Sequence, residues 1–330
     1  MYMNNGFWNG KNVFITGSDG FIASWITKTL VSFGSNVTVV VRKPEKKNAL
    51  DLLKIREKVN VVQGDILDLE RMKEIFKKNK VEYCFHLAAQ AIVGDANTSP
   101  LPTFECNIKG TWNVLEAARL CETLKGMVVA SSDKAYGDQK VLPYNEEQPL
   151  NGLYPYDASK ACTDIISRSY AKMYSLPIAV TRCANIYGGG DLHMRRIVPG
   201  TISSVLKGET PIIRSDGTLE RDYMYIEDCV DAYLTLAENV HKPEIRSQAF
   251  NFGNGIPISV TTLFNKIISA CGSDVKPKIL GQNKGEINRQ FLGVEKANTL
   301  LNWKASTPLK EGLEKTVKWY KENRNLWEDQ

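Results

Sequence analysis

Short apolar runs alternate with longer amphipathic stretches along the first 186 residues of the chain. The short runs are rich in β-branched residues and predict buried strands over residues 13–16, 37–41, 59–62, 81–87, 127–130 and 178–182. The amphipathic stretches predict helices, one reaching Gly34 through Trp25 and Leu30, the others over residues 68–78, 104–124 and 156–174. Strand–helix alternation at this spacing predicts an α/β fold, a Rossmann-type doubly wound parallel sheet.

Beyond Asn185 the regular alternation ends. A glycine-rich turn over residues 188–191 precedes a helix that runs to Leu206, and the tail over residues 294–319 reads as two helices split by Pro308. We therefore expect a smaller C-terminal substrate-binding lobe on the parallel sheet. Residues 1–186, with returning segments at about 218–256, would form the sheet domain, and residues 187–217 and 257–330 the lobe.

Composition narrows the class of protein. The chain has 330 residues, 43% apolar and 24% charged, which is ordinary for a soluble globular protein. Its net charge of +5 comes with no basic run interleaved with aromatics, so we expect no nucleic-acid partner. No apolar stretch approaches the roughly 20 residues that span a bilayer. Seven dispersed cysteines and three scattered histidines predict reduced thiols and no metal site, and the polar start lacks a signal-peptide core, so we expect a cytoplasmic location.

A glycine-rich turn joins the first predicted strand to the first predicted helix. Three small residues stand three positions apart in this turn, Gly17, Gly20 and Ala23, a spacing that is a short form of the dinucleotide fingerprint. A tight strand–helix turn that binds no ligand would also need glycine. Such a turn brings the backbone and a helix N-terminus close to a pyrophosphate. The expected pyrophosphate-binding residues are Gly17, Ser18, Asp19, Gly20, Phe21 and Ile22.

Residues just beyond the next strands are expected to hold the rest of a dinucleotide. Arg42 follows the second strand, where an acid would bond the 2′-hydroxyl of NAD and an arginine suits the 2′-phosphate of NADP, so NADP is slightly favoured. Asp65, with Ile66, follows the third strand and can reach the adenine amine. Small residues after the fourth strand would let the backbone pass a flat ligand; this segment is Leu87, Ala88, Ala89 and Gln90. His86 before it is expected to be a packed core histidine.

The segment from Ala130 to Lys160 holds the candidate chemistry. Tyr156 and Lys160 stand four apart and share one helix face, where the ammonium is expected to lower the pKa of the phenol and make it a general base. Ser132, Asp133 and Lys134 leave the predicted strand at its carboxyl end. Asp133 could instead cap a turn and Lys134 could be a surface lysine, but together after Ser132 they favour a second acid–base pair.

These motifs, in this order, resemble the extended short-chain dehydrogenase/reductase family and its nucleotide-sugar epimerase and dehydratase branch. The residues that carry the resemblance are Gly17–Ile22, Asn107, Ser132, Tyr156, Lys160 and residues 221–223. It implies NAD(P)+ as cofactor, with Asn107, Tyr156 and Lys160 in its site, and a nucleotide-diphosphate sugar as substrate. The implied substrate-binding residues are Gln90, Asn185, Arg196, Arg221 and Arg289. The family also implies a homodimer formed through the helices at 104–124 and 156–174.

Within that branch, Asp133-Lys134 after Ser132 is similar to the Asp-Lys form of sugar-nucleotide 4,6-dehydratases found in the CDP-glucose enzymes, and Arg42 resembles the NADP-using GDP-mannose dehydratases. The opening Phe7-Trp8, the Ser24-Trp25 pair and residues 188–191 resemble the CDP-glucose subgroup, whereas residues 221–223 read Arg-Asp-Tyr where that subgroup has Arg-Pro-Trp. The resemblance thus implies a 4,6-dehydratase. An epimerase using only Ser132, Tyr156 and Lys160, or a non-catalytic cofactor sensor, stays open, as do the base and the sugar.

Overall fold

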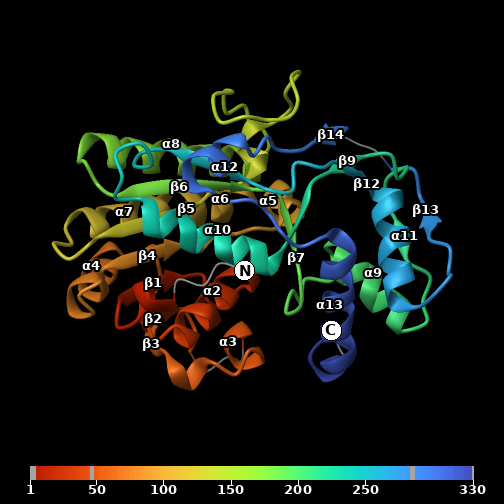
Figure 1. The fold of residues 1–330 in the computed structure, drawn as a ribbon, viewed down its shortest axis with the longest axis horizontal. Helices are drawn as coiled ribbons and strands as arrows, with labels where there is room; N and C mark the ends of the chain where they lie inside the picture. Colours follow the sequence, from red (N-terminus) through yellow and green to blue (C-terminus); the bar gives the residue numbers. More distant parts are fainter. Residues whose placement is uncertain (1–4, 45–47, 283–286, 329–330) are drawn as a thin grey trace.

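Seven parallel strands form the central sheet of the computed structural model, which describes residues 5–44, 48–282 and 287–328 (Figure 1). Their order is β11-β6-β5-β4-β1-β2-β3, and every neighbouring pair is parallel. The strands are β1 (Asn12–Thr16), β2 (Asn36–Val41), β3 (Asn60–Gln63), β4 (Tyr83–His86), β5 (Gly126–Ala130), β6 (Ile178–Cys183) and β11 (Ala249–Phe252). The predicted Rossmann-type doubly wound sheet is confirmed, with β11 as a further strand that the hydrophobic pattern did not single out.

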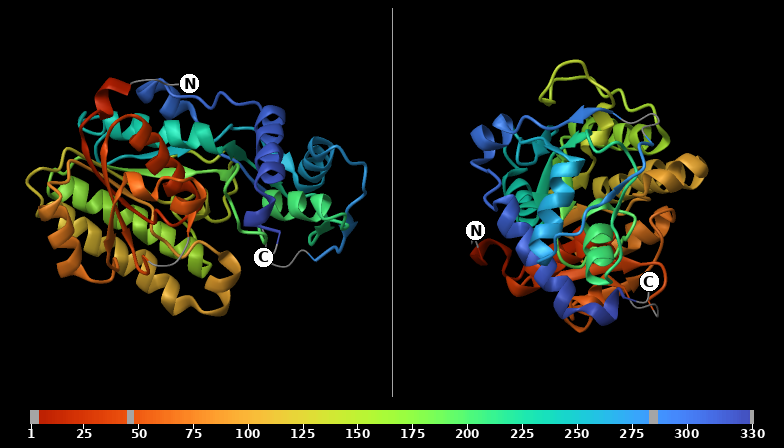
Figure 2. Two further views of the ribbon diagram at one scale, coloured as in Figure 1. Left: turned by 90° about the horizontal axis from the view of Figure 1, so that it is seen from below. Right: turned by 90° about the vertical axis from the view of Figure 1, so that its right-hand side faces the viewer.

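Helices cover both faces of the sheet. One face carries α4 (Leu69–Lys78), α7 (Gly110–Arg119) and α8 (Pro155–Met173), and the other carries α2 (Phe21–Ser32) and α10 (Ile226–Asn239). Figure 2, left, shows the sheet between the green and gold helices α8 and α7 and the teal helix α10. Successive residues of each strand point to opposite faces of the sheet, so each face has its own hydrophobic core. Val13 and Ile15 pack on the face that α2 covers, while Phe14 packs against Phe76 on the opposite face.

The helix expected over residues 104–124 differs from the prediction. It begins as α6 (Pro100–Phe104), passes through the π-helical segment η2 (Glu105–Lys109) and continues as α7, which ends at Arg119. The stretch after Arg119 turns back to the sheet because Thr123 Oγ1 donates to Val81 O at 2.8 Å. The predicted end at Leu124 is therefore wrong by about one turn.

The later half of the chain builds a smaller body beside the carboxyl ends of the strands, at the right of Figure 1. β7 (Asn185–Tyr187) leaves the sheet and pairs with β10 (Tyr223–Tyr225). The three helices α9 (Ile197–Leu206), α11 (Val260–Cys271) and α13 (Leu309–Glu322) pack together there. Around them lie the short strands β8 (Ile212–Ile213), β9 (Glu220–Arg221), β12 (Ile258–Ser259), β13 (Lys278–Ile279) and β14 (Arg289–Gln290). α12 (Glu295–Leu301) returns to pack on β11 and α10.

Short helical pieces connect these layers. They are α1 (Asn5–Trp8), α3 (Ala49–Leu52), α5 (Val93–Thr98) and the 3-10 turns η1 (Arg56–Lys58), η3 (Asp133–Tyr136) and η4 (Arg324–Leu326). The Trp25 indole, on α2, donates to Gly189 O at 2.8 Å, so two motifs far apart in sequence meet between sheet and lobe. No helix within the described ranges has the length and apolar character that crossing a bilayer requires.

Candidate active site

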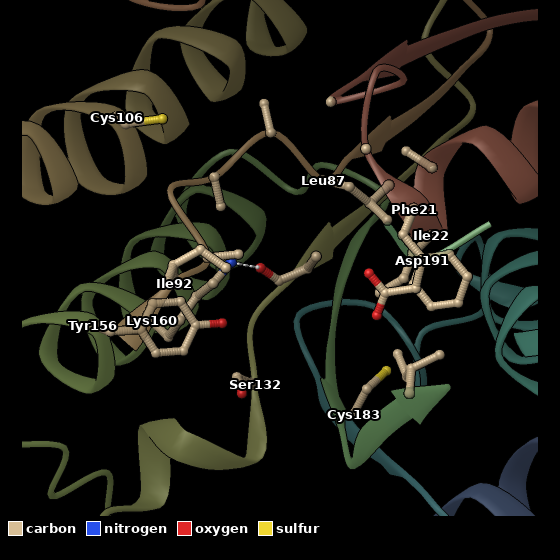
Figure 3. Close-up of a pocket in the computed structure, with 18 of the residues that line it drawn as sticks. Phe21, Ile22, Leu87, Ile92, Cys106, Ser132, Tyr156, Lys160, Cys183 and Asp191 are labelled. Atoms are coloured by element: carbon tan, nitrogen blue, oxygen red, sulfur yellow. Dashed lines mark hydrogen bonds between the residues drawn. The ribbon is translucent and has the colours of Figure 1, made fainter. Parts of the chain in front are cut away.

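A cavity of about 780 Å³ opens at the carboxyl ends of β1, β2, β4, β5 and β6, between the sheet and the lobe. Open α/β sheets bind their ligands at this edge. The cavity wall includes most of the predicted site residues: Gly17, Asp19, Gly20, Phe21, Ile22, Arg42, Asp65, Ile66, Leu87, Ala88, Ala89, Ser132, Asp133, Lys134, Tyr156, Lys160, Asn185 and Arg196. Figure 3 shows Tyr156, Lys160 and Ser132 on one side of it, opposite Phe21 and Asp191.

The turn between β1 and α2 has the shape that a dinucleotide requires. A Cβ on Gly17 would lie 2.7 Å from Ala88 N, and its φ of +75° is one that glycine adopts freely. α2 starts after Gly20 with no side-chain cap, so its first N–H groups remain for a ligand. Ser18 Oγ, in the same turn, is buried without a hydrogen-bond partner among the described residues. These features fit a pyrophosphate.

Arg42, Asp65 and Ile66 line the cavity just beyond the ends of β2 and β3. One Asp65 oxygen accepts the Leu67 amide at 2.9 Å, and Asn113 Nδ2 holds Ile66 O at 2.9 Å, so this turn is fixed from behind. Arg42 lies at the end of β2, as the sequence predicted. A cation and a carboxylate therefore stand at two neighbouring strand ends, an arrangement that fits the ribose and adenine of a dinucleotide.

Asn107 and Gln90 do not line the cavity but support its wall. Asn107 Oδ1 accepts the Gln90 amide at 2.7 Å, while its Nδ2 donates to Gln90 O at 3.0 Å and to Ser159 Oγ at 2.9 Å. Asn107 thus ties the loop after β4 to the helix that carries Tyr156. His86 is buried between Thr16 and Thr111, and burial lowers its pKa to about 3, in keeping with a packed core histidine.

The predicted phosphate-binding arginines separate into two groups. Arg196 lines the cavity and is held by both carboxylate oxygens of Asp191, each at 3.0 Å. Arg221 and Arg289 lie outside the lining, on the paired strands β9 and β14, where Arg289 Nε is 2.5 Å from Glu220. Arg214 lines the cavity from the end of β8, a position that the dispersed basic residues of the later sequence did not single out.

Tyr156 and Lys160 share a helix face, but their electrostatics differ from the prediction. Lys160 Nζ donates to Ala130 O at 2.9 Å and lies 6.0 Å from the centre of the Tyr156 ring. Burial raises the pKa of Tyr156 to about 12, and the charge of Asp133 adds to the rise while a hydrogen bond with Ser132 opposes it. Burial lowers the pKa of Lys160 to about 8. The expectation that Lys160 lowers the pKa of Tyr156 is therefore wrong.

Ser132, Asp133 and Lys134 form a connected turn at the end of β5. Ser132 Oγ donates to Asp133 Oδ1 at 2.9 Å and accepts the Lys134 amide at 3.2 Å, capping η3. Lys134 Nζ lies 3.4 Å from Asp133 Oδ2 and also donates to Gln290 Oε1. A hydroxyl, a carboxyl and an amine thus meet a phenol and a second lysine in one cavity, the groups needed for several proton transfers.

Comparison with known proteins agrees with this geometry. Residues 13–253 match the model of the NAD dependent epimerase/dehydratase family. The CDP-glucose 4,6-dehydratase of Salmonella typhimurium is 28% identical, the match covering 96% of this chain and 92% of the relative. A UDP-glucose 4-epimerase structure from Thermotoga maritima superimposes with a TM-score of 0.87 at 30% identity, covering 95% and 99% of the two chains.

A second solved structure bears on the cofactor. The dTDP-glucose 4,6-dehydratase DesIV of Streptomyces venezuelae, determined with NAD bound, has a TM-score of 0.86 at 26% identity over 96% of this chain and 99% of that one. Dehydratases and epimerases therefore stand at similar distances from this sequence. Fold, cavity and family match agree that the chain belongs to the NAD dependent epimerase/dehydratase family and is a nucleotide-sugar-modifying enzyme.

Proposed function

We propose that this enzyme is a nucleotide-sugar 4,6-dehydratase, which converts an NDP-hexose to an NDP-4-keto-6-deoxyhexose and water. The observation that carries the proposal is the pair Asp133 and Lys134, both of which line the cavity beside Ser132 and Tyr156. An epimerase needs one base and a hydroxyl donor, which Tyr156 and Ser132 supply. Elimination of water requires a second acid and a second base in addition, and Asp133 and Lys134 would supply them.

The residues divide the reaction between them. Ser132 would hold the sugar C4 hydroxyl while Tyr156 removes its proton, and Lys160 would orient the cofactor ribose and the phenol. Bound NAD(P)+ would supply reversible hydride transfer, out of C4 in the oxidation and back to C6 after water has left. Lys134, in its neutral form, would remove the C5 proton that the 4-keto group acidifies. Asp133 would protonate the C6 hydroxyl as it leaves as water, and a proton returned to C5 completes a reaction with no net use of cofactor.

The substrate's diphosphate would be held by arginines from the lobe. Arg196 lines the cavity, whereas Arg221 and Arg289 lie outside its lining on the paired strands β9 and β14, Arg221 opposite Gln290 and Arg289 opposite Glu220. Planar guanidinium groups pair well with phosphate oxygens. Asn185 would donate to the same diphosphate, and Gln90, outside the cavity lining, would support the sugar site through the wall that it forms with Asn107. The lobe is accordingly proposed as residues 187–217 and 257–330, and the dinucleotide domain as 1–186 with 218–256.

Cofactor choice, assembly and location complete the proposal. Arg42 in the cavity wall supports NADP slightly over NAD. Leu101, Trp112 and Ile165 are exposed apolar residues on α6, α7 and α8, and they support a homodimer formed through these helices. Free cysteines throughout the described ranges support a cytoplasmic enzyme.

Mass spectrometry tests the reaction directly. The enzyme is incubated with CDP-, GDP-, UDP- and dTDP-glucose and with GDP-mannose, and one of them is expected to lose one water. Lys134→Ala should abolish this loss, whereas Lys140→Ala, a substitution on the exposed loop, should not. The competing function, suggested by the 30% identity to a UDP-glucose 4-epimerase, predicts an isomer of unchanged mass. Isomer formation without water loss would replace the dehydratase by the epimerase.

A further inference from the structure

One buried amide from the lobe contacts both members of the proposed acid–base pair. Gln290 Nε2 donates to the main-chain oxygen of Asp133 at 3.0 Å, and Gln290 Oε1 accepts from Lys134 Nζ. Gln290 is 1% exposed. The amide nitrogen and the amide oxygen of Gln290 therefore each hydrogen-bond one of two consecutive residues, Asp133 and Lys134.

We propose that Gln290 is a positioning residue that aims the Lys134 amine at the substrate, an inference that rests on the proposed dehydratase function. An amide oxygen can only accept, so Lys134 must direct an N–H toward Gln290 whether it is charged or neutral. Asp133 Oδ2, 3.4 Å from the same nitrogen, occupies a second direction. The lone pair of the neutral amine then points away from Gln290 and from Asp133. Because Lys134 lines the cavity, we infer that this direction is toward the substrate.

The strand that carries this amide also carries a proposed phosphate ligand. β14 pairs in parallel with β9, and Gln290 stands opposite Arg221 while Arg289 stands opposite Glu220. Successive residues of a strand point to opposite sides, which agrees with an Arg289 side chain 52% exposed beside a buried Gln290. Gln290 and Arg221 therefore face the same side of these two strands, and a diphosphate bound by Arg221 would be held by the strands that also hold Lys134.

A purely structural amide is the competing explanation, since burial requires its polar atoms to be satisfied. Such a role would lower stability and slow every step alike. A positioning role acts on one step, because the hydrogen bonds of the Gln290 amide in the described structure go to Asp133 and Lys134, so that Ser132, Tyr156 and Lys160 remain in place for hydride transfer. The two explanations therefore differ in how the partial reactions respond.

The test separates the two partial reactions in a Gln290→Met variant, which keeps the side chain's length and removes both hydrogen bonds. Formation of reduced nicotinamide should change less than about twofold. Release of water and uptake of solvent deuterium at C5 should slow by about 10- to 100-fold, the cost of a misplaced catalytic group, with KM little changed. Gln248→Met is the matched control, because it removes a Lys296–Gln248 hydrogen bond of 2.9 Å on the exposed side of α12.

A Gln290→Glu variant adds a readout that a structural role would not move. A carboxylate beside Lys134 favours the ammonium, so elimination should require a higher pH than in the native enzyme. Without substrate, reductive methylation of Lys134, followed by mass spectrometry, should be faster in Gln290→Met than in the native protein at similar melting temperatures.

The outcomes distinguish the two claims. Equal slowing of both partial reactions, or unchanged elimination and unchanged Lys134 methylation, would overturn the role of Gln290 while leaving the dehydratase intact. A native enzyme that removes water from no nucleotide sugar would overturn the proposed function. The methylation rate would then still decide whether Gln290 holds Lys134.

Discussion

Ser132 donates its hydroxyl hydrogen to Asp133, with 2.9 Å between Oγ and Oδ1. The residue proposed to hold the substrate hydroxyl therefore also orients the proposed acid, and the hydrogen bond must be exchanged when a sugar binds. Ser132→Ala should slow both oxidation and water release by about 100-fold, in the range for loss of a positioned proton-transfer group, while Ser132→Thr should retain most activity. Stopped-flow absorbance of the nicotinamide and mass spectrometry of the product measure the two steps. A variant slowed only in oxidation would show that the bond to Asp133 is dispensable.

Arg42 is expected to decide between the two forms of the cofactor. Because a 2′-phosphate can pair with its guanidinium, Arg42→Ala should weaken NADP binding by about 10- to 100-fold, the worth of one hydrogen bond to a charged group, and leave NAD binding nearly unchanged. Isothermal titration of each dinucleotide measures this directly. Lys43→Ala, the neighbouring cation outside the cavity lining, is the control. Equal weakening of both dinucleotides would remove Arg42 as the discriminating residue.

The Lys160 side chain is expected to lower the free energy of unfolding of the protein when no ligand is bound. Its pKa is lowered by burial to about 8, so at neutral pH the folded state carries an unfavourable buried charge that the unfolded chain does not. Lys160→Met should stabilise the protein by about 2 kcal/mol at pH 7, after the lost bond to Ala130 offsets about 1 kcal/mol, and should abolish turnover.

The pH dependence of that difference follows from linkage. Below pH 8 lysine is charged in both states and the penalty is complete, whereas between about pH 8 and 10.5 the folded state binds fewer protons than the unfolded one. Native stability should therefore approach that of Lys160→Met as the pH rises through this window. Denaturant unfolding at pH 7 and pH 10 tests it, and a difference that grows with pH would contradict the burial of a charged Lys160.

Substitution of Gly17 tests the nucleotide-binding turn, and the same substitution of Gly10, outside that turn, is its control. Both have φ above +70°, but a Cβ on Gly10 meets nothing within 4 Å, whereas one on Gly17 would lie 2.7 Å from Ala88 N. Gly10→Ala should cost about 1 kcal/mol of unfolding free energy from its backbone conformation alone. Gly17→Ala should cost more and should also weaken dinucleotide binding about 10-fold or more, measured by thermal unfolding with and without NAD(P)+. Equal effects of the two substitutions would show that the approach to Ala88 is unimportant.

The parallel sheet could be predicted because each strand is recognisable from a short run of consecutive residues. Runs such as residues 37–41 are β-branched and apolar on both faces, a pattern that few structures besides a covered parallel strand satisfy. Chemistry at the ends of these strands followed from the same reasoning, since Ser132, Asp133 and Lys134 had to leave the sheet together. The start of α2 was predictable from its glycines.

The interactions that cross between sheet and lobe could not be predicted in the same way. Gln290 lies 156 residues from Lys134, and its amide reaches the site only because β14 pairs with β9. The pKa of Tyr156 was predicted in the wrong direction because spacing reveals a neighbouring lysine but not the depth of burial. Arg214 likewise reaches the cavity through the path of the lobe, which no short pattern encodes.

The widened helical turn at Glu105–Lys109 has a consequence for how this chain can change over evolution. A single-turn π segment accommodates one extra residue while the helix beyond it keeps its rotational phase. Here it leaves the Asn107 carbonyl oxygen free to accept the hydroxyls of Thr111 at 2.6 Å and Thr163 at 2.8 Å. The segment thus joins its helix to α8 while Val114 and Leu115 stay in the core. Deleting one residue there should loosen the support of the active-site helix and leave the core intact.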